Sequence, residues 1–458
     1  MPEGFGGLAY QGVTNTHPVA IGAVLVLGVT MLLLPRRAAI LPMLIIACFI
    51  SSVQKVVVFG LDFNLLRILL LFGTARLIYR KEYRGFSWKT LDTAIVWWAV
   101  SSIVIYTLQQ GSFSAFVNRL GFAFDAFGMY FLFRCLIRSW EDANTIVFGI
   151  LLISIPVALF FLLESRTGRN LFSMFGGVPA MTPIRDGRLR CQGAYSHAIL
   201  AGCFWASLIP FFAAYGWKSE KSMIWAVIGI INSCFIVVCC ASSTPLMSVI
   251  AAIIGGAMFF FRRYMRLIRW GLLVTLIVLH MVMNAPVWHL ISRISAVGGS
   301  TSYFRYMLIN GAINHFNEWA ILGTKVTAHW GWGAQDITNQ YILEGVHGGF
   351  LTLCLFVIVI AYAFRDVGRL WRQNSGSPSR VALAWAMGVS LFVHCMNFIG
   401  VSYFGQIHIL WYLLLAMIGS LTIAPNRMPV QKPGRVSVPY KKQPYNYRKS
   451  SQYPHGIH

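Results

Sequence analysis

The stretch NTIVFGILLISIPVALFFLL, residues 144–163, contains twenty residues and no charged side chain. A helix needs roughly 20 mainly apolar residues to cross a bilayer, because every backbone polar group in the hydrocarbon core must be satisfied within the segment. The stretch therefore predicts a membrane-spanning helix. The whole chain has the same character: of 458 residues, 57% are hydrophobic and 11% are charged, whereas soluble domains carry about 25% charged residues.

Twelve further apolar stretches predict spanning helices in the same way. With the first, they lie near 18–34, 38–59, 61–79, 91–107, 114–137, 144–163, 194–217, 221–240, 244–261, 267–283, 345–364, 381–399 and 403–424. Lys55, Asp62 and Arg67 interrupt the second and third, so twelve spans are an alternative. The predicted fold class is all-α: a polytopic integral membrane protein with about 12 to 13 transmembrane helices in one membrane domain, residues 1–424.

The distribution of lysine and arginine predicts the orientation, because these residues favour cytoplasmic connections. Every second connection between the predicted spans lies on the same side of the membrane, and one of the two sets is rich in basic residues. It holds Arg36 and Arg37, Arg80, Lys81, Arg84 and Lys89, Arg138, Lys218 and Lys221, Arg262, Arg263 and Arg266, and Arg365, Arg369, Arg372 and Arg380. We assign this set to the cytoplasm. The opposite set faces outward and includes two long connections, 164–193 and 284–344.

The C-terminal tail, residues 425–458, has seven Lys or Arg and no acid. This composition predicts a disordered cytoplasmic tail, either a solvated orientation signal or a segment that lies against anionic headgroups. The net charge of +23 is spread over connections at the membrane edge without a recognition motif. That distribution favours a lipid bilayer as partner and excludes nucleic acid.

The first outward connection ends in RDGRLRCQGAYSHAILAG, residues 185–202, with arginines at 185, 188 and 190. Arginine suits phosphate, because its planar fork makes two charge-assisted hydrogen bonds and stays protonated. An alternative interpretation of Arg166, Arg169 and Arg185 is that they only contact the phosphates of lipid headgroups. Arg188 and Arg190 directly precede Gly193 and a helix start, where we expect an anion to approach the backbone.

The second outward connection predicts short amphipathic helices, since apolar residues recur at helical spacing from Ser302 to Phe316. Arg305 lies on this helix. Trp319, Trp330 and Trp332 favour an interfacial belt or a sugar-stacking surface. Candidate acids and bases stand just before the next span: Asp336, Glu344 and His347. A cationic patch beside acids and imidazoles is typical of transfer chemistry on a lipid-linked phosphate.

Several other site classes have no support in the sequence. The nine cysteines form no CxxC pair and no metal-ligand spacing, so we expect buried thiols, no disulfides, no metal and no cofactor. A phosphate loop of the GKS/T type, a GxSxG elbow and an HExxH helix are also missing from the sequence.

These features together resemble the bacterial O-antigen ligase and O-antigen polymerase superfamily. The residues that carry the likeness are Arg190, Gly193 and His197 in RCQGAYSHAILAG, Arg305 in SYFRYMLINGA, and NQYILEGVHGGFLTL at 339–353 with Asn339 and Tyr341. The likeness is best over 185–360, and the first half of the chain matches only in hydropathy.

The resemblance implies a metal-independent, inverting glycosyl transfer at the periplasmic face of the bacterial inner membrane. The donor would be an undecaprenyl pyrophosphate-linked glycan, and the acceptor would be lipid A core for a ligase or a second glycan for a polymerase. Arg188, Arg190 and Arg305 would stabilise the departing pyrophosphate, and Arg185, Gly193, His197, Asn339 and Tyr341 would bind substrate. These roles place the protein in lipopolysaccharide biosynthesis of the cell envelope.

Two departures from the family pattern bear on these roles. Thr338 stands where the family usually carries a histidine, so Asp336, Glu344 and His347 are substitutes for a general base. Thr244 and Pro245 stand in a span where many relatives have an arginine. His197 lies in the first turn of a predicted span, so a packing role is the alternative to substrate binding.

Charged residues at membrane depth are expected to face the interior of the helix bundle and to pair there. These are Lys55, Arg67, Arg119 and Asp125. The six-residue spacing of Arg119 and Asp125 does not suit a pair on one helix, which favours partners on other helices.

A transporter or flippase for lipid-linked oligosaccharide is the alternative function. Transporters are typified by internal repeats and a site near the bilayer midplane. This sequence has no repeat at a fixed period, and its polar residues gather in two outward connections, which favours an enzyme. A scaffold that recruits partners through the basic tail leaves those connections without a role.

Overall fold

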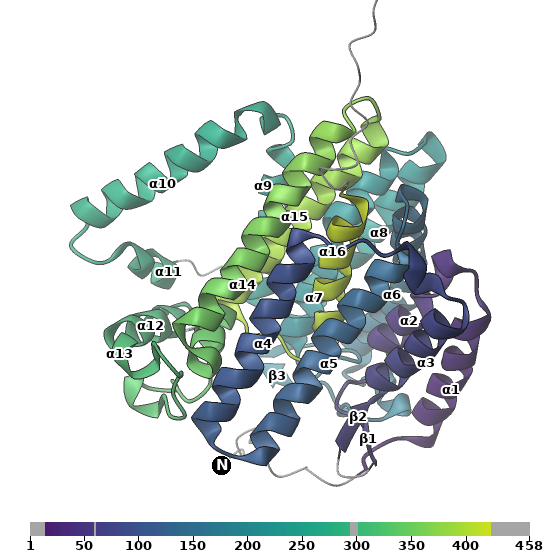
Figure 1. Ribbon diagram of the computed structural model, residues 1–458, viewed down its shortest axis with the longest axis horizontal. Coiled ribbons are helices and arrows are strands. Elements are labelled where there is room, and N and C mark those ends of the chain that lie inside the picture. The colour runs from purple at the N-terminus through teal and green to yellow at the C-terminus, as the bar shows by residue number, and fades with distance from the viewer. Residues whose placement is uncertain (1–13, 59–60, 294–300, 423–458) are drawn as a thin grey trace, which may run out of the picture. The chain divides into compact units, whose positions relative to one another are not determined.

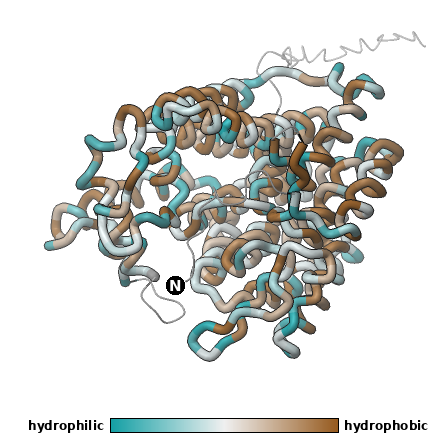
Figure 2. The backbone as a smooth tube through the Cα atoms, turned by 90° about the horizontal axis from the view of Figure 1, so that it is seen from below, coloured by the Kyte–Doolittle hydropathy of each residue, from teal (hydrophilic) through white to brown (hydrophobic). Residues whose placement is uncertain are grey.

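The computed structural model describes residues 14–58, 61–293 and 301–422, which are mainly helical (Figure 1). The prediction of a disordered tail over 425–458 lies outside the described residues. Figure 2 shows hydrophobic residues along the helices and hydrophilic residues gathered in the connections between them. That distribution is the one expected of helices that face a membrane or one another.

The first helices are α1 (Pro18–Leu33), the 3-10 turn η1 (Arg36–Ala38), α2 (Leu41–Phe49) and α3 (Leu65–Tyr79). Between α2 and α3 the chain forms an antiparallel hairpin of β1 (Lys55–Val58) and β2 (Leu61–Asn64), with Lys55 opposite Asn64 and Val57 opposite Asp62. The predicted helix over 38–59 is therefore wrong in its second half. Three consecutive valines favour a strand, and Lys55 Nζ lies 2.6 Å from Asp62 Oδ2.

Three long elements follow: η2 (Glu82–Gly85) leads into α4 (Thr90–Gln110), α5 (Phe113–Leu136) and α6 (Trp140–Thr167). Ser139 begins α6 with a capping box, since its side chain accepts from the Asp142 N–H and Asp142 in turn accepts from the Ser139 N–H. Such reciprocal bonds satisfy the free donors of a first helical turn. Gly168 ends α6 in the left-handed conformation, with φ of 68°.

The connection after α6 contains η3 (Leu171–Phe175) and a second small hairpin, β3 (Ile184–Arg185) with β4 (Arg188–Leu189). Then come α7 (Ala198–Gly216), α8 (Glu220–Cys239) and α9 (Ser243–Ala257). Seventeen of the nineteen residues of α7 are buried. This helix is therefore central, and it packs against α8, α9 and α15 (Pro378–Gly400) (Figure 1).

The second long connection begins after η4 (Arg262–Tyr264) and α10 (Met265–Val282), a helix that buries none of its residues. It contains η5 (Val287–His289), α11 (Leu290–Arg293), α12 (Thr301–Asn314), α13 (Phe316–Trp319) and η6 (Ala328–Trp330). The predicted helix around Arg305 is present as α12. Trp319 and Trp330 are buried in a small hydrophobic cluster, so only Trp332 fits the predicted exposed surface, with 82% of its area accessible.

The last helices are α14 (Gln340–Gln373), α15 and α16 (Ile407–Leu421). Gly349 breaks the helical conformation inside α14, with φ of 66° and ψ of −179°. A Cβ there would lie 2.2 Å from the Ile321 carbonyl oxygen, and the Phe350 N–H donates to the Ala320 carbonyl at 2.8 Å. Glycine therefore lets the chain after α13 pack directly on the backbone of α14.

Seven helices among the described residues are long and apolar enough to cross a membrane. They are α4, α6, α7, α8, the segment Arg262–Val282 that includes α10, α14 and α15. Three shorter apolar helices, α1, α9 and α16, accompany them. This architecture is typical of an α-helical membrane protein.

Candidate anion-binding site

Four helices begin at the end of the bundle that the sequence assigns to the outside, here called the predicted outer end. They are α7, α9, α14 and α16, and contacts hold their first turns together. Gln406, at the start of α16, donates from Nε2 to the Ala194 carbonyl just before α7 at 2.7 Å. The Tyr403 N–H donates to Gln340 Oε1 in the first turn of α14 at 2.8 Å. Helix N-termini carry partial positive charge, so this end favours anions.

One buried carboxylate ties the segment with Arg190 to α6. Glu164, in the last turn of α6, is fully buried. Its oxygens accept hydrogen bonds from the backbone N–H groups of Gln192 at 3.0 Å and Gly193 at 3.1 Å, and from the Thr182 hydroxyl at 3.0 Å. These donors satisfy the acid at the end of an apolar helix. Sequence reasoning missed Glu164, although a lone acid at the end of a spanning segment is the relevant signal.

Gly193 belongs to this internal network. Its φ is +57°, and a Cβ there would lie 2.5 Å from the Phe161 ring. The Gly193 N–H donates to Glu164, and the Gly193 carbonyl accepts from Asn170 Nδ2 at 2.8 Å. The expectation that an anion approaches this backbone is therefore wrong, because both polar groups already have partners. The glycine instead permits close packing on Phe161.

Arg185 and Arg188 lie on the exposed β3–β4 hairpin and face each other across it. Asp186 and Gly187 form its turn with positive φ values of 50° and 72°, which suits a tight two-residue hairpin. Arg185 Nε lies 3.7 Å from Asp186 Oδ2, and both side chains are largely exposed. These two arginines therefore stand at the surface of the site.

Arg190, directly after this hairpin, is half-buried. Its backbone N–H donates to the Pro183 carbonyl at 2.9 Å, which fixes the start of the side chain. Its Nε is buried and has no hydrogen-bond partner among the described residues. Burial first, and then the neighbouring Arg185, lowers the pKa of Arg190 from its ordinary 12.5. Asp186, the carboxylate that raises this pKa in turn, is the exposed partner of Arg185.

His197 caps the N-terminus of α7, where its Nδ1 accepts from the Ile199 N–H at 3.4 Å. Burial is the largest cause that lowers the pKa of His197 below its ordinary 6.5, followed by the charges of Arg190 and Arg185. The imidazole is therefore neutral at pH 7. It lies within the field of both arginines.

Arg305, on α12, reaches the first turn of α9. Its Nη2 donates to Thr244 Oγ1 at 2.7 Å, and a Cβ on Gly400 would lie 3.3 Å from its Nε. Burial lowers the pKa of Arg305 from its ordinary 12.5.

Arg190 and Arg305 flank the same junction of α7 with the end of α8 and the start of α9. A Cβ on Gly202 would lie 2.5 Å from the Pro245 side chain and 3.4 Å from the Cys240 Cβ. The Cys191 N–H, next to Arg190, donates to the Cys239 carbonyl at the end of α8 at 3.1 Å, and Arg305 donates to Thr244 in the first turn of α9. The structure therefore brings the two predicted arginines to one region of the predicted outer end.

A polar network lies below Arg305. The Ser248 hydroxyl bonds to the Thr244 carbonyl at 2.8 Å and to Asn397 Oδ1. Asn397 Nδ2 donates to the Tyr403 hydroxyl at 3.1 Å, which lies 2.6 Å from His394 Nδ1. Because the hydroxyl accepts from the amide, its own proton points to His394. The three-residue spacing of His394 and Asn397 in an apolar stretch was the signal that sequence reasoning missed.

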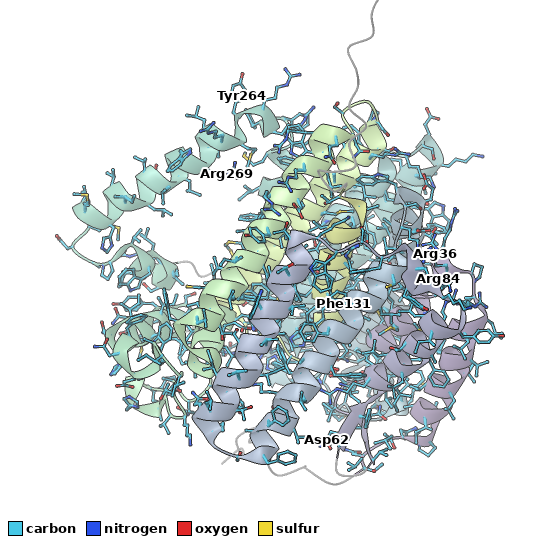
Figure 3. The ribbon with its side chains drawn as sticks, in the orientation of Figure 1. Arg36, Asp62, Arg84, Phe131, Tyr264 and Arg269 are labelled. Carbon is cyan, nitrogen blue, oxygen red and sulfur yellow. The ribbon has the colours of Figure 1, made fainter. Side chains whose placement is uncertain are left out.

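Most buried arginines of the bundle have a carboxylate partner. The pairs are Arg36 with Asp142 at 2.7 Å, Arg67 with Asp125 at 2.7 Å, Arg76 with Glu82 at 2.9 Å and Arg134 with Asp92 at 3.0 Å. Figure 3 labels Arg36, which lies well away from Asp62 on the β1–β2 hairpin. Arg67 and Asp125 belong to different helices, as the spacing of the charged residues favoured.

Arg119, Arg190 and Arg305 differ from these, since none of them forms an ion pair with a described residue. Arg119 stacks over the Tyr106 ring with 3.9 Å to its centre, and its Nε is buried without a hydrogen-bond partner among the described residues. The three lie near the predicted outer end. Unpaired cations in partly buried places favour an anionic ligand.

The residues predicted around the start of α14 serve mainly to build it. Asn339 caps the helix through its Oδ1, which accepts from the Ile342 N–H at 3.1 Å. The Tyr341 hydroxyl donates to the Cys395 carbonyl at 3.2 Å. The Glu344 carboxylate accepts from Trp98 Nε1 at 2.9 Å and from Gln340 Nε2 at 2.8 Å.

The three candidate general bases do not form the predicted cluster. Glu344 is buried and fully engaged within the bundle, and His347 packs edge-on against the Tyr106 ring at 5.4 Å. Asp336 is exposed in the preceding loop, where its backbone N–H donates to the Gly333 carbonyl at 3.1 Å. The reason is that α14 begins at Gln340, so Glu344 and His347 stand inside a helix that Asp336 precedes.

All nine cysteines are free, and each is buried or half-buried. Comparison of the sequence with protein-family models gives no match, and comparison with curated protein sequences gives none.

Proposed function

We propose that the chain is a membrane glycosyltransferase that moves an undecaprenyl pyrophosphate-linked glycan to an acceptor sugar at the periplasmic face of the bacterial inner membrane. The observation that carries this proposal is the pair of partly buried arginines, Arg190 and Arg305, beside four helix N-termini. Neither arginine has a carboxylate partner among the residues that the structure describes. A diphosphate is the ligand whose charge and oxygen geometry suit such a place.

The proposed topology extends the seven long apolar helices to 12 or 13 spans. The shorter helices α1, α9 and α16, the hydrophobic α3 and α5, and the nine-residue α2 would complete the bundle. The arginine-rich connections would face the cytoplasm, and the β3–β4 hairpin and α12 would face the periplasm.

In the proposed reaction an acceptor hydroxyl attacks the anomeric carbon of the donor glycan and inverts it. The bond from that carbon to the pyrophosphate oxygen breaks, and the lipid pyrophosphate leaves with its negative charge. Arg190 and Arg305 would stabilise this charge, and arginines aimed at developing charge contribute roughly 10²- to 10³-fold each in rate. The acceptor proton would pass to Asp336, His347 or solvent, since the Glu344 carboxylate is engaged by Trp98 and Gln340.

Reconstitution into proteoliposomes with a lipid-linked glycan donor tests the proposal. We expect transfer to lipid A core or to a second lipid-linked glycan, scored by product length, and Arg190→Ala and Arg305→Ala should each lower it by at least about 100-fold. Arg→Lys at either position should restore only part of the activity, because an ammonium keeps the charge but not the fork.

Arg166→Ala is the matched control, because Arg166 is exposed at the end of α6 on the same predicted side. It should retain full activity, and all variants should insert at wild-type levels. Retained transfer in both Arg190→Ala and Arg305→Ala would contradict the proposal. Donor translocation without any transfer to either acceptor would instead support a flippase.

A further inference from the structure

Three potential metal ligands meet in the second long connection, just after the C-terminal end of α12. His315 follows α12, Glu318 lies in α13, and His329 lies in η6. One ligand atom from each lies within 4.8 Å of the other two. The spacing is His-x2-Glu-x10-His. Among the described residues no other group of three or more such side chains meets this way.

The distances suit a small divalent transition ion. Zn²⁺ binds histidine nitrogen and carboxylate oxygen at about 2.0 to 2.1 Å, which places tetrahedral ligand atoms about 3.3 Å apart. His329 Nε2 and Glu318 Oε2 are 2.8 Å apart, and the widest separation in the group is 4.8 Å at most. The three ligand atoms therefore lie at separations close to the required one.

The surrounding contacts orient these ligands as metal sites require. His315 Nδ1 lies 2.9 Å from the Gly311 carbonyl oxygen, which only accepts, so Nδ1 carries the proton and Nε2 keeps its lone pair in the neutral ring. Trp330 Nε1 donates to Glu318 Oε2 at 3.1 Å. A second hydrogen bond to each ligand, from or to a neighbouring group, is typical of protein metal sites.

We propose that His315, Glu318 and His329 bind one Zn²⁺ ion, with water in the fourth position. The side chains of Glu318 and His329 are 40% and 49% exposed, so an ion has access to them. Two imidazoles and one carboxylate form a borderline-soft ligand set, which suits Zn²⁺ and Co²⁺ rather than Ca²⁺ or Mg²⁺.

The ion would hold η6 to the end of the helix that carries Arg305. Arg305 and His315 are ten residues apart, or about 15 Å along a helix at 1.5 Å per residue. The metal is therefore placed to fix α12 and not to contact a ligand held by Arg305. This inference does not depend on the proposed transferase activity.

Metal content and Co²⁺ absorption test the site directly. The full chain is purified without a polyhistidine tag, loaded with Zn²⁺ or Co²⁺, and dialysed. We expect one bound ion per chain, visible absorption of a low-coordinate Co²⁺ centre, and at least tenfold weaker binding in His315→Ala, His329→Ala and Glu318→Gln. Glu318→Gln preserves the shape of the side chain, so its loss of binding cannot be ascribed to misfolding.

His289→Ala is the matched control, since His289 lies in the same connection and packs against the Tyr306 ring at 4.7 Å, outside the group. It should bind metal as the wild type does. Failure of the wild type to retain an ion, or equal binding by His315→Ala, His329→Ala and the wild type, would overturn the site. In that case the 2.8 Å contact between Glu318 and His329 is only a hydrogen bond.

Discussion

Arg67 and Arg190 have similar side chains but different partners. Arg67 donates two hydrogen bonds to the Asp125 carboxylate at 2.8 and 2.7 Å, whereas the buried Nε of Arg190 has no partner among the described residues. Removing one member of a buried ion pair leaves an uncompensated charge, which is strongly destabilising. Removing a cation that has no ion-pair partner leaves no uncompensated charge in the protein.

The two arginines should therefore respond oppositely to truncation. We expect Arg67→Ala to lower the free energy of unfolding by about 3 kcal/mol, and Arg190→Ala to leave it unchanged or slightly raised. Thermal unfolding of both variants in detergent measures this difference. A large loss of stability in Arg190→Ala would show that the guanidinium has a structural partner and would remove the case for a ligand.

His197 gives a pH dependence with a definite sign. Burial and the neighbouring Arg190 and Arg185 lower the pKa of His197 in the folded protein below 6.5, so below that pH the unfolded chain binds a proton that the folded chain does not. The free energy of unfolding should therefore fall as pH drops from 6.5 toward the folded pKa. His197→Asn keeps a capping side chain that does not titrate.

The measurement is the thermal midpoint of both proteins between pH 7.5 and about pH 5. We expect the curve of His197→Asn to be flatter than that of the wild type over this range. Parallel curves would mean that His197 does not carry the lowered pKa. Because other histidines contribute equally to both proteins, only the difference between the curves is interpreted.

At the scale of elements, the segment between α6 and α7 is fixed by backbone contacts that favour glycine at two positions. Gly187 and Gly193 both have positive φ values, of 72° and 57°. A Cβ at Gly187 meets nothing within 4 Å, whereas a Cβ at Gly193 would lie 2.5 Å from the Phe161 ring. An alanine at either position would be strained by the positive φ, and only the space around its methyl group would differ.

Substituting each glycine by alanine separates the cost of backbone strain from the cost of a steric clash. We expect Gly187→Ala to lower the free energy of unfolding by about 1 kcal/mol through its positive φ. Gly193→Ala should lower it by a further 1 to 3 kcal/mol, roughly, because the methyl group collides with a buried ring. Chemical denaturation in detergent measures both, and equal effects would contradict the packing described for Phe161.

Some of the elements could be predicted from the sequence, and others could not. Apolar length predicted the long helices, and periodicity predicted α12, because both depend on local spacing. The hairpin at Lys55–Asn64 was missed because a run of valines is as apolar as a spanning helix, and only its β-branched side chains favour a strand. Glu164 was missed for another reason: its partners lie up to 29 residues away in sequence.

The arginines of the site could be predicted from the sequence, but the arrangement of its acidic residues could not. Arg190 and Arg305 stood out because arginine is unusual on an outward connection. Asp336, Glu344 and His347 were grouped by nearness in sequence, but the start of α14 separates Asp336 from the other two. The partner of Arg305, Thr244, lies 61 residues away and has no signal of its own.

At the scale of the whole molecule, the account requires the β3–β4 hairpin and the α14–α15 connection to lie on opposite sides of the membrane. Gly187 and Gly376 are exposed glycines in these two places, and a Cβ at either meets nothing within 4 Å. We expect a membrane-impermeant maleimide to label Gly187→Cys in cells with a permeabilised outer membrane, and Gly376→Cys only after lysis.

The unmodified chain serves as the control for this labelling, since its nine cysteines are buried or half-buried and should react slowly. Labelling of Gly376→Cys before lysis, with Gly187→Cys protected, would reverse the orientation. The arginines would then face the cytoplasm, where a periplasmic transferase has no use for them.

The affinity of the purified protein for undecaprenyl pyrophosphate is the deciding measurement, because the proposed site binds a diphosphate through the guanidinium groups of Arg190 and Arg305. We expect saturable binding that weakens at least about tenfold in Arg190→Ala and in Arg305→Ala, the equivalent of one lost charge-assisted bond. Arg166→Ala should bind as the wild type does. Equal affinity across the wild type and all three variants would contradict the account.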